Sequence, residues 1–268
     1  MIAKSNQSSN SGRHIAAGLV VILLFGGLLA APASAVTLTF REGLNGYTGT
    51  QDTYLQQDPA NQGTNNGAAL DFGWDGDDPA TTGFDVDGLI RFDNIFGAGG
   101  SQIPVGAEIT EATLFLTVFN TGDAGSVRRV LTNWTEASTY SSFCGGGCAE
   151  GVNYTAEVGS LTAGTATEIS VNVTSSVQAW SDGATNFGWI IRPSTGTDGV
   201  DVRSSEYATT VTQRPRLVVR FNEGQPPVGN LVREPYLQRL SSSSVTICWR
   251  SDVPSDSLVR YGTTQGVL

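Results

Sequence analysis

Short runs of alternating apolar and polar residues, separated by glycine, asparagine, aspartate and serine, dominate the chain between residues 36 and 222. The clearest runs are VTLTFRE, GLIRFD, EITEATLFLTVFN, VRRVLTNW, FGWIIRPS and RPRLVVRF. A period of two is typical of β-strands, and many short strands joined by glycine-rich turns indicate a sandwich or a jelly roll. We therefore predict an all-β fold, a jelly-roll β-sandwich, over residues 36–222.

Two segments within this region make sharper predictions. The run EATLFLTVF carries bulky side chains on both faces, which predicts a central strand. Its two predicted faces are Ala112, Leu114, Leu116 and Val118, and Thr113, Phe115, Thr117 and Phe119. The only plausible helix is VTSSVQAWSDG, residues 173–183, where Val173, Val177 and Trp180 would share one face and Gly183 would end the helix.

The first 35 residues have the pattern of a secretory signal peptide. Lys4 and Arg13 precede an apolar run, residues 15–29, and an A-x-A sequence ends at Ala35. We expect cleavage after Ala35, and a protein that is secreted or displayed at the cell surface. An uncleaved membrane anchor is the alternative, but the apolar run is shorter than the roughly 20 residues that a spanning helix needs.

Removal of this segment changes the available chemistry. Lys4, His14 and Met1 are the only residues of their types, so the chain from Val36 contains no histidine. That excludes a Ser-His-Asp triad, a Cys-His pair and any metal site that needs imidazole. The remaining 13 basic and 25 acidic residues give a net charge of −12, which disfavours nucleic acids and anionic membranes as partners.

Carboxylates remain as candidate catalytic groups. Glu136, Glu150 and Glu206 could in principle support glycoside hydrolysis, but the sequence does not place two carboxylates at a working separation. We therefore expect no catalytic activity from this chain.

The cysteines divide into a close pair and a single residue. Cys144 and Cys148 flank three glycines, and with a secretory signal such a loop predicts a local disulfide. A metal site or a redox pair is the alternative. Cys248 stands beside Trp249 in a strand-like run, where a buried thiol is the default expectation.

An acidic loop, LDFGWDGDDPATTGFDVDG, spans residues 70–88. Oxygen-rich loops suit calcium, and Asp75, Asp77 and Asp78 are the first candidate ligands for a structural ion. The alternative is a solvated acidic loop, because the match to an EF-hand is poor. Few apolar residues flank Trp74 in the sequence, which predicts an exposed ring that could stack on a sugar.

Several segments together resemble one known family. They are DTYLQQDPANQGTNNGAALDFG, GLIRFD, IPVGAEITEATLFL, VRRVLTNWTE, VTSSVQAWSDGATNFGWIIRP and RSSEYATTVTQRPRLVVRF. In this order they look like the DNRLRE domain, a carbohydrate-binding module family, over roughly residues 40–222. The resemblance implies a secreted β-sandwich, and some members bind acidic polysaccharides such as alginate. Arg91, Trp134, Glu136 and Glu206 occupy recurring motif positions.

The candidate carbohydrate-binding residues are Trp74, Arg91, Trp134, Glu136, Tyr140 and Arg203. The expected partner is a polysaccharide, either an acidic or a neutral one. For an acidic ligand, the charge of the chain must be offset by bridging calcium or by a local basic patch such as Arg91, Arg128, Arg129 and Arg203.

A second domain is expected after a linker, residues 223–233, that contains Pro226 and Pro227. Residues 234–268 resemble the start of the fibronectin type III-like N-terminal domain of purple acid phosphatases, through PYLQ, a strand ending in CW, and SLVRYG. A complete sandwich of this kind needs about 100 residues, so we expect a truncated chain.

These observations support three hypotheses about function. The first is a secreted, non-catalytic carbohydrate-binding module, the N-terminal targeting region of a larger metallophosphoesterase. The second is a fragment of a purple acid phosphatase-like enzyme whose catalytic domain is missing. The third is a structural or adhesive surface domain without glycan specificity.

Overall fold

The computed structural model describes residues 35–162, 167–194, 196–222, 231–238 and 246–252. The predicted signal peptide lies outside these residues, apart from Ala35. The chain divides into a unit of residues 34–224 and a second unit that includes residues 225–268. Of the helices that the structure describes, none has the length and apolar character to span a membrane.

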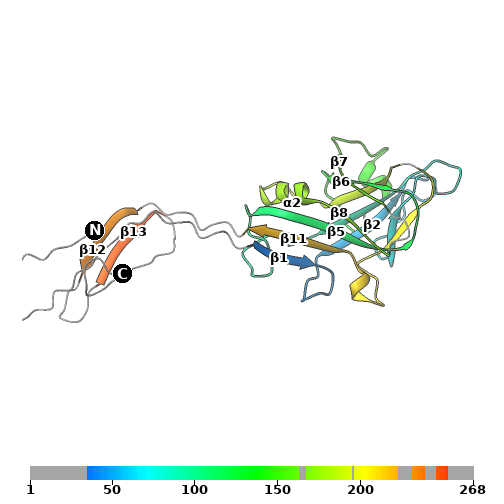
Figure 1. The fold of residues 1–268 in the computed structure, drawn as a ribbon. Coiled ribbons are helices and arrows are strands. Elements are labelled where there is room, and N and C mark those ends of the chain that lie inside the picture. The colour runs from blue at the N-terminus through cyan, green and yellow to red at the C-terminus, as the bar shows by residue number, and fades with distance from the viewer. Residues whose placement is uncertain (1–34, 163–166, 195, 223–230, 239–245, 253–268) are drawn as a thin grey trace, which may run out of the picture. The chain divides into compact units, whose positions relative to one another are not determined.

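The described residues between 35 and 222 form two antiparallel sheets packed face to face, which confirms the predicted all-β sandwich (Figure 1). The finer jelly-roll connectivity stays a prediction. The six-stranded sheet has the order β1-β11-β5-β10-β3, with β8 also paired to β5. Its strands are β1 (Ala35–Phe40), β3 (Asp71–Trp74), β5 (Glu108–Asn120), β8 (Glu168–Asn172), β10 (Val200–Arg203) and β11 (Arg216–Asn222).

The five-stranded sheet has the order β2-β4-β9-β6-β7. Its strands are β2 (Thr50–Gln56), β4 (Val86–Phe92), β6 (Gly125–Val130), β7 (Tyr154–Leu161) and β9 (Trp189–Pro193). One short 3-10 helix, η1 (Val211–Gln213), lies in the loop between β10 and β11.

The long strand β5 is central to its sheet, as its two bulky faces predicted. It pairs with β11, β8 and β10 along its length. Its predicted inner set, Ala112, Leu114, Leu116 and Val118, is buried. Phe115 is half-buried and Phe119 is exposed on the opposite face, so the outer side of this sheet carries aromatic rings in contact with solvent.

The main core fills the space between the sheets and extends to helix α2 (Thr174–Ser181), where a helix was predicted. Val173, Val177 and Trp180 are buried there. Thr174 and Gln178 tie the helix to the start of β5, since their side chains accept hydrogen bonds from the backbone N–H groups of Ala112 and Ile109.

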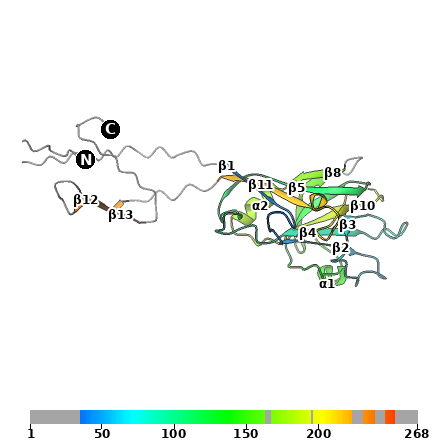
Figure 2. The same cartoon turned by 90° about the horizontal axis from the view of Figure 1, so that it is seen from below.

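A second core covers the outer face of the five-stranded sheet. Strand side chains Leu55, Leu89, Val130 and Ile190 pack there against Trp134, Tyr140, Phe143 and Tyr154. The covering segment, residues 131–153, contains the short helix α1 (Tyr140–Cys144), which begins in a capping box formed by Thr139 and Ser142. Figure 2 shows α1 on the far side of β2 and β4 from β5 and β11.

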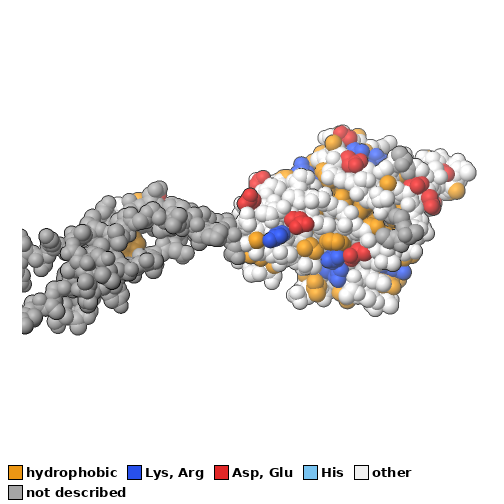
Figure 3. Space-filling model, viewed as in Figure 1, with side chains coloured by type: hydrophobic (Ala, Val, Ile, Leu, Met, Phe, Trp, Pro, Cys, Tyr) orange, Lys and Arg blue, Asp and Glu red, His pale blue; other side chains and the backbone are white. Residues whose placement is uncertain are grey.

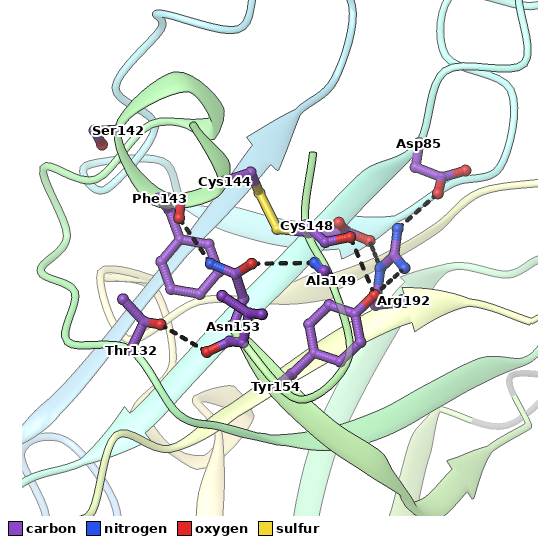
Figure 4. The surroundings of a disulfide bond; sticks show 12 residues. Asp85, Thr132, Ser142, Phe143, Cys144, Cys148, Ala149, Asn153, Tyr154 and Arg192 are labelled. Carbon is purple, nitrogen blue, oxygen red and sulfur yellow. Dashed lines mark hydrogen bonds and ion pairs between the residues drawn. A yellow bond between two sulfur atoms is a disulfide. The ribbon is translucent and has the colours of Figure 1, made fainter. Parts of the chain in front are cut away.

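The predicted disulfide between Cys144 and Cys148 closes this covering segment (Figure 4). The Asn153 side chain donates to the carbonyl of Phe143, 2.9 Å away, and accepts from the N–H of Ala149, 3.1 Å away. The disulfide and Asn153 therefore hold the two ends of the glycine loop against the second core.

Strand β2 lies at one edge of its sheet, and side chains bond its outward backbone groups. Glu42 accepts from the N–H of Thr50 at 3.1 Å, Glu136 accepts from the N–H of Asp52, and Asn66 donates to the carbonyl of Tyr54 at 3.0 Å. Alternate backbone groups along this edge are therefore already paired.

The described part of the second unit is an antiparallel pair, β12 (Leu231–Gln238) and β13 (Thr246–Ser251). Strand β12 begins inside the predicted linker of residues 223–233. The predicted strand SLVRYG lies outside the described residues. Cys248 is half-buried, and its thiol lies 3.3 Å from Oε1 of Gln238, so the expectation of a fully buried thiol is wrong.

Replacement of both Cys144 and Cys148 by serine should destabilise the sandwich. Loss of so short a ring should lower the free energy of unfolding by about 2 kcal/mol, because the unfolded chain gains conformational freedom. Urea denaturation of the purified variant would measure the loss, and wild-type protein kept in reductant should show the same change. An unchanged midpoint would show that the ring contributes no stability.

Candidate functional site

Five side chains on the outer side of the six-stranded sheet form what we call the Arg–aromatic face: Phe115, Phe119, Arg203, Tyr207 and Arg216. The guanidinium carbon of Arg203 lies 4.0 Å from the ring centre of Phe119 and 4.3 Å from that of Tyr207. That of Arg216 lies 3.7 Å from the ring centre of Phe115. Each distance is well within the range of a cation–π contact.

Strand register produces these stacks. Phe115 and Phe119 are four residues apart on β5, so they point to the same side of the sheet. Arg216 is the direct cross-strand partner of Phe115. On β10, Val202 pairs with Val118, which places the next residue, Arg203, on the outer side beside Phe119.

Positive charge gathers at this face. Burial lowers the pKa of Arg41, and the nearby Arg216 lowers it further. Arg216 forms a 2.8 Å ion pair with Glu168, whereas Arg203 forms no ion pair with any residue that the structure describes. Figure 3 shows basic and hydrophobic side chains side by side over β5 and β11.

The prediction that Trp74 is an exposed sugar platform is wrong. The side chain is 1% exposed, and its indole N–H donates to the carbonyl of Asp123 at 3.1 Å. The ring packs between the sheets against Gly125 and Ile191, which are distant in the sequence. Tyr140 is also buried, in the second core, and cannot stack on a surface ligand as it stands.

Arg91, Trp134 and Glu136 lie together, but two of the three are buried. The Arg91 guanidinium stacks 5.0 Å from the Trp134 ring centre and donates to the Trp134 carbonyl at 2.9 Å. It also pairs with Asp93 at 2.7 Å. Glu136 is half-buried and bonds the edge of β2. The structure therefore gives Arg91 and Trp134 a role in holding the covering segment.

A cluster of carboxyl groups lies at the edge of β2, beside this segment. Asp52 is fully buried and accepts a 2.9 Å hydrogen bond from the N–H of Ser205. Burial raises the pKa of Asp52 well above its usual range, and the neighbouring Glu206 raises it further. Burial and Glu206 also raise the pKa of Glu136.

An acidic groove lies near β3 and β10. Its volume is about 410 Å³, and its lining includes Asp71, Asp75, Asp77, Asp78, Asp198 and Asp201. Burial raises the pKa of Asp75 and of Asp201, and neighbouring aspartates add to both shifts. The structure thus brings Asp198 and Asp201 next to the acidic loop of residues 70–88. The sequence predicted only the aspartates of that loop as candidate ligands.

The predicted calcium ligands do not converge as a set. Asp77 accepts hydrogen bonds from the N–H groups of Gly83 at 2.7 Å and Thr81 at 2.6 Å, so both its oxygens organise the loop. Within the described ranges, no three acidic, histidine or cysteine side chains are grouped so as to hold a metal ion. Calcium binding by Asp75, Asp77 and Asp78 stays a prediction.

Sequence reasoning identified Arg203 but missed its companions in the face. The suggested patch of Arg91, Arg128, Arg129 and Arg203 does not form, because Arg91 lies on β4 and Arg128 and Arg129 lie on β6 of the other sheet. The outward phenylalanines of β5 were a usable signal, since two large apolar residues on the second face of a strand need an explanation.

A scan against protein-family models found no match, and a search of curated proteins also found none. The resemblance to the DNRLRE domain and to the N-terminal domain of purple acid phosphatases therefore stays a proposal.

Asp201→Asn should stabilise the sandwich at neutral pH. The raised pKa means that the folded state favours the protonated carboxyl, so the stability that this proton supplies is lost as the pH rises through that pKa. Asparagine mimics the neutral form, so thermal melts of wild type and variant should differ at about pH 7.5 and agree at about pH 3. A variant that is less stable at neutral pH would contradict this.

The same melts test the calcium hypothesis. Calcium bound in the groove should raise the melting temperature of the wild type at about 1 mM, and a chelator should reverse the rise. Sodium chloride of equal ionic strength is the control, because it screens the repulsion between carboxylates without occupying a site. A melting curve that neither calcium nor chelator changes would count against the hypothesis.

Proposed function

We propose that residues 36–222 form a secreted, non-catalytic carbohydrate-binding module that takes an acidic polysaccharide on the Arg–aromatic face. The observation that carries the proposal is the stacking of Arg203 between Phe119 and Tyr207, next to the stack of Arg216 on Phe115.

The chemistry of the stacks suits an anionic sugar polymer. A guanidinium that contacts aromatic rings through its face keeps its N–H edge available for a carboxylate, which it can bind through two parallel hydrogen bonds. Phe119 is 45% exposed, and an exposed ring can pack on the apolar face of a sugar. The two stacks lie four residues apart along β5, an extended arrangement that suits a linear polymer.

Local arginines offset part of the electrostatic difficulty of a chain with a net charge of −12. Arg41 lies near Arg216, whose charge is partly offset by Glu168, and Arg203 lies across β5 beside Phe119. The acidic groove adjoins the Arg203 end of this face, because Asp71 is the cross-strand partner of Arg203 and Asp201 lies two residues before it on β10. Screening at physiological salt therefore weakens but does not remove the repulsion between these carboxylates and an anionic ligand.

The resemblance to the DNRLRE domain supports this function, because some members of that family bind acidic polysaccharides. The pair β12–β13 is compatible with the first strands of a fibronectin type III-like domain. On that interpretation, the module is the N-terminal targeting region of a metallophosphoesterase and tethers that enzyme to a glycan surface.

Arg203→Ala should weaken binding to a polyuronate by about tenfold, which corresponds to roughly 1.4 kcal/mol. Phe119→Ala should weaken binding by a similar factor, because the guanidinium loses one of its two stacking rings. Affinity electrophoresis in gels that contain alginate, compared with gels that contain a neutral β-glucan, would measure both variants.

Arg128→Gln is the matched control, because it removes the same charge from the other sheet. It should migrate like the wild type apart from the change in its own charge. Equal retardation of the wild type and all three variants would show that the glycan binds at another site. No retardation of the wild type on acidic or neutral glycans would favour a structural or adhesive domain.

A further inference from the structure

The loop between β10 and β11, residues 204–215, carries Tyr207 and is attached to the sandwich at its first two residues. The Ser204 hydroxyl donates to the carbonyl of Ala69 at 2.7 Å, and the N–H of Ser205 donates to Oδ2 of Asp52 at 2.9 Å. Ser204 and Ser205 are buried. These bonds determine the path of the backbone that leads directly to Tyr207, and thus where its ring lies against Arg203.

The carboxyl group of Glu206 is a neighbour of the Asp52 carboxyl group at this attachment. The Ser205 hydroxyl donates to Oε1 of Glu206 at 2.9 Å. The other oxygen, Oε2, is buried and has no hydrogen-bond partner among the described residues. Two neighbouring carboxyl groups away from water cannot both be ionised without a large cost. A proton retained by Asp52 relieves the repulsion between the two groups.

The hydrogen bonds from Ser205 to Asp52 favour the ionised carboxyl, but burial and the neighbouring acidic groups outweigh them and favour retention of the proton. Glu136 from the covering segment faces both Asp52 and Glu206, and Glu42 from the loop after β1 faces Glu136. Arg91 on β4 faces Glu136 but is engaged by Asp93.

Within the loop itself, the Arg214 guanidinium donates to the backbone carbonyls of Tyr207 at 2.8 Å and Glu42 at 3.2 Å. It therefore holds the loop through backbone groups and does not pair with the carboxyl group of Asp52 or of Glu206.

We propose that a proton held between Asp52 and Glu206 anchors the 204–215 loop and positions Tyr207 over Arg203, so that the Arg–aromatic face binds its glycan more tightly at low pH than at high pH. Asp52, Ser205 and Glu206 are positioning residues, since they act on the face through Tyr207. The inference rests on the proposed glycan-binding function.

The direction of the pH dependence follows from the raised pKa of Asp52. The anchored arrangement is favoured below that pKa and loses stability as the pH rises through it, when Asp52 ionises in its buried position beside Glu206. The apparent dissociation constant rises as the anchored fraction of molecules falls. Asp52→Asn preserves an acceptor for Ser205 and a donor for Glu206, so it should remain anchored at every pH.

Calorimetric titration of the full chain with alginate between about pH 5 and pH 9 tests the proposal. The wild-type dissociation constant should rise by at least about threefold across this range, whereas that of Asp52→Asn should keep its low-pH value throughout. Asp87→Asn is the matched control. Asp87 is another fully buried carboxyl with a raised pKa, on the outer side of β4, and its replacement should leave the wild-type rise intact. A flat wild-type profile, or a rise that persists in Asp52→Asn, would overturn the proposal.

Hydrogen exchange of the Ser205 and Glu206 amides provides a second readout that needs no glycan. After correction for intrinsic rates, protection should fall with rising pH in the wild type and stay constant in Asp52→Asn. If this pattern is seen but alginate does not bind, the proposed glycan-binding function is wrong and the proposed anchor is supported. If protection in the wild type does not depend on pH, the anchor is wrong whatever the binding data show.

Discussion

The structure depends on the burial of β4 on both of its faces. All seven residues of this strand are buried, and the two faces belong to different cores: Ile90 and Phe92 pack between the sheets, whereas Leu89 packs outward. A sheet that is apolar on both faces must be covered on both faces. The segment of residues 131–153, with α1 and the disulfide, provides the second cover, and without it Leu55, Leu89 and Ile190 would face water.

Because of this requirement, the outer faces of the two sheets differ in what covers them. The outer face of the five-stranded sheet is occupied by a protein segment, so its buried charged side chains, such as Arg91 and Asp87, serve the packing. The outer face of the six-stranded sheet carries no such cover at Phe119. Its aromatic rings are paired with arginines, which keeps the face hydrated without a large exposed apolar patch. In the described part of the chain, the two sheets thus differ in what lies over their outer faces.

Much of the fold was predictable, because alternation along a strand directly reports which side chains are buried. The central strand β5, helix α2 and the local disulfide follow from periodicity and spacing within a few residues. The candidate site was less predictable, since it depends on register between distant strands. The polar neighbours of Trp74 in the chain predict an exposed ring, but its packing partners Gly125 and Ile191 come from β6 and β9. Likewise, nothing local to Arg203 or Arg216 shows that strand pairing will place each of them over a phenylalanine of β5.

The side chains that bond the edge of β2 have a consequence for how the protein behaves in a crowded solution. An unpaired strand edge is a template on which another chain can add a strand, and this is a common route to aggregation. Here Glu42, Glu136 and Asn66 already occupy the outward groups of Thr50, Asp52 and Tyr54. A foreign strand would have to displace three polar contacts and approach two carboxylates. This edge of the sandwich is therefore protected against self-association by side chains alone.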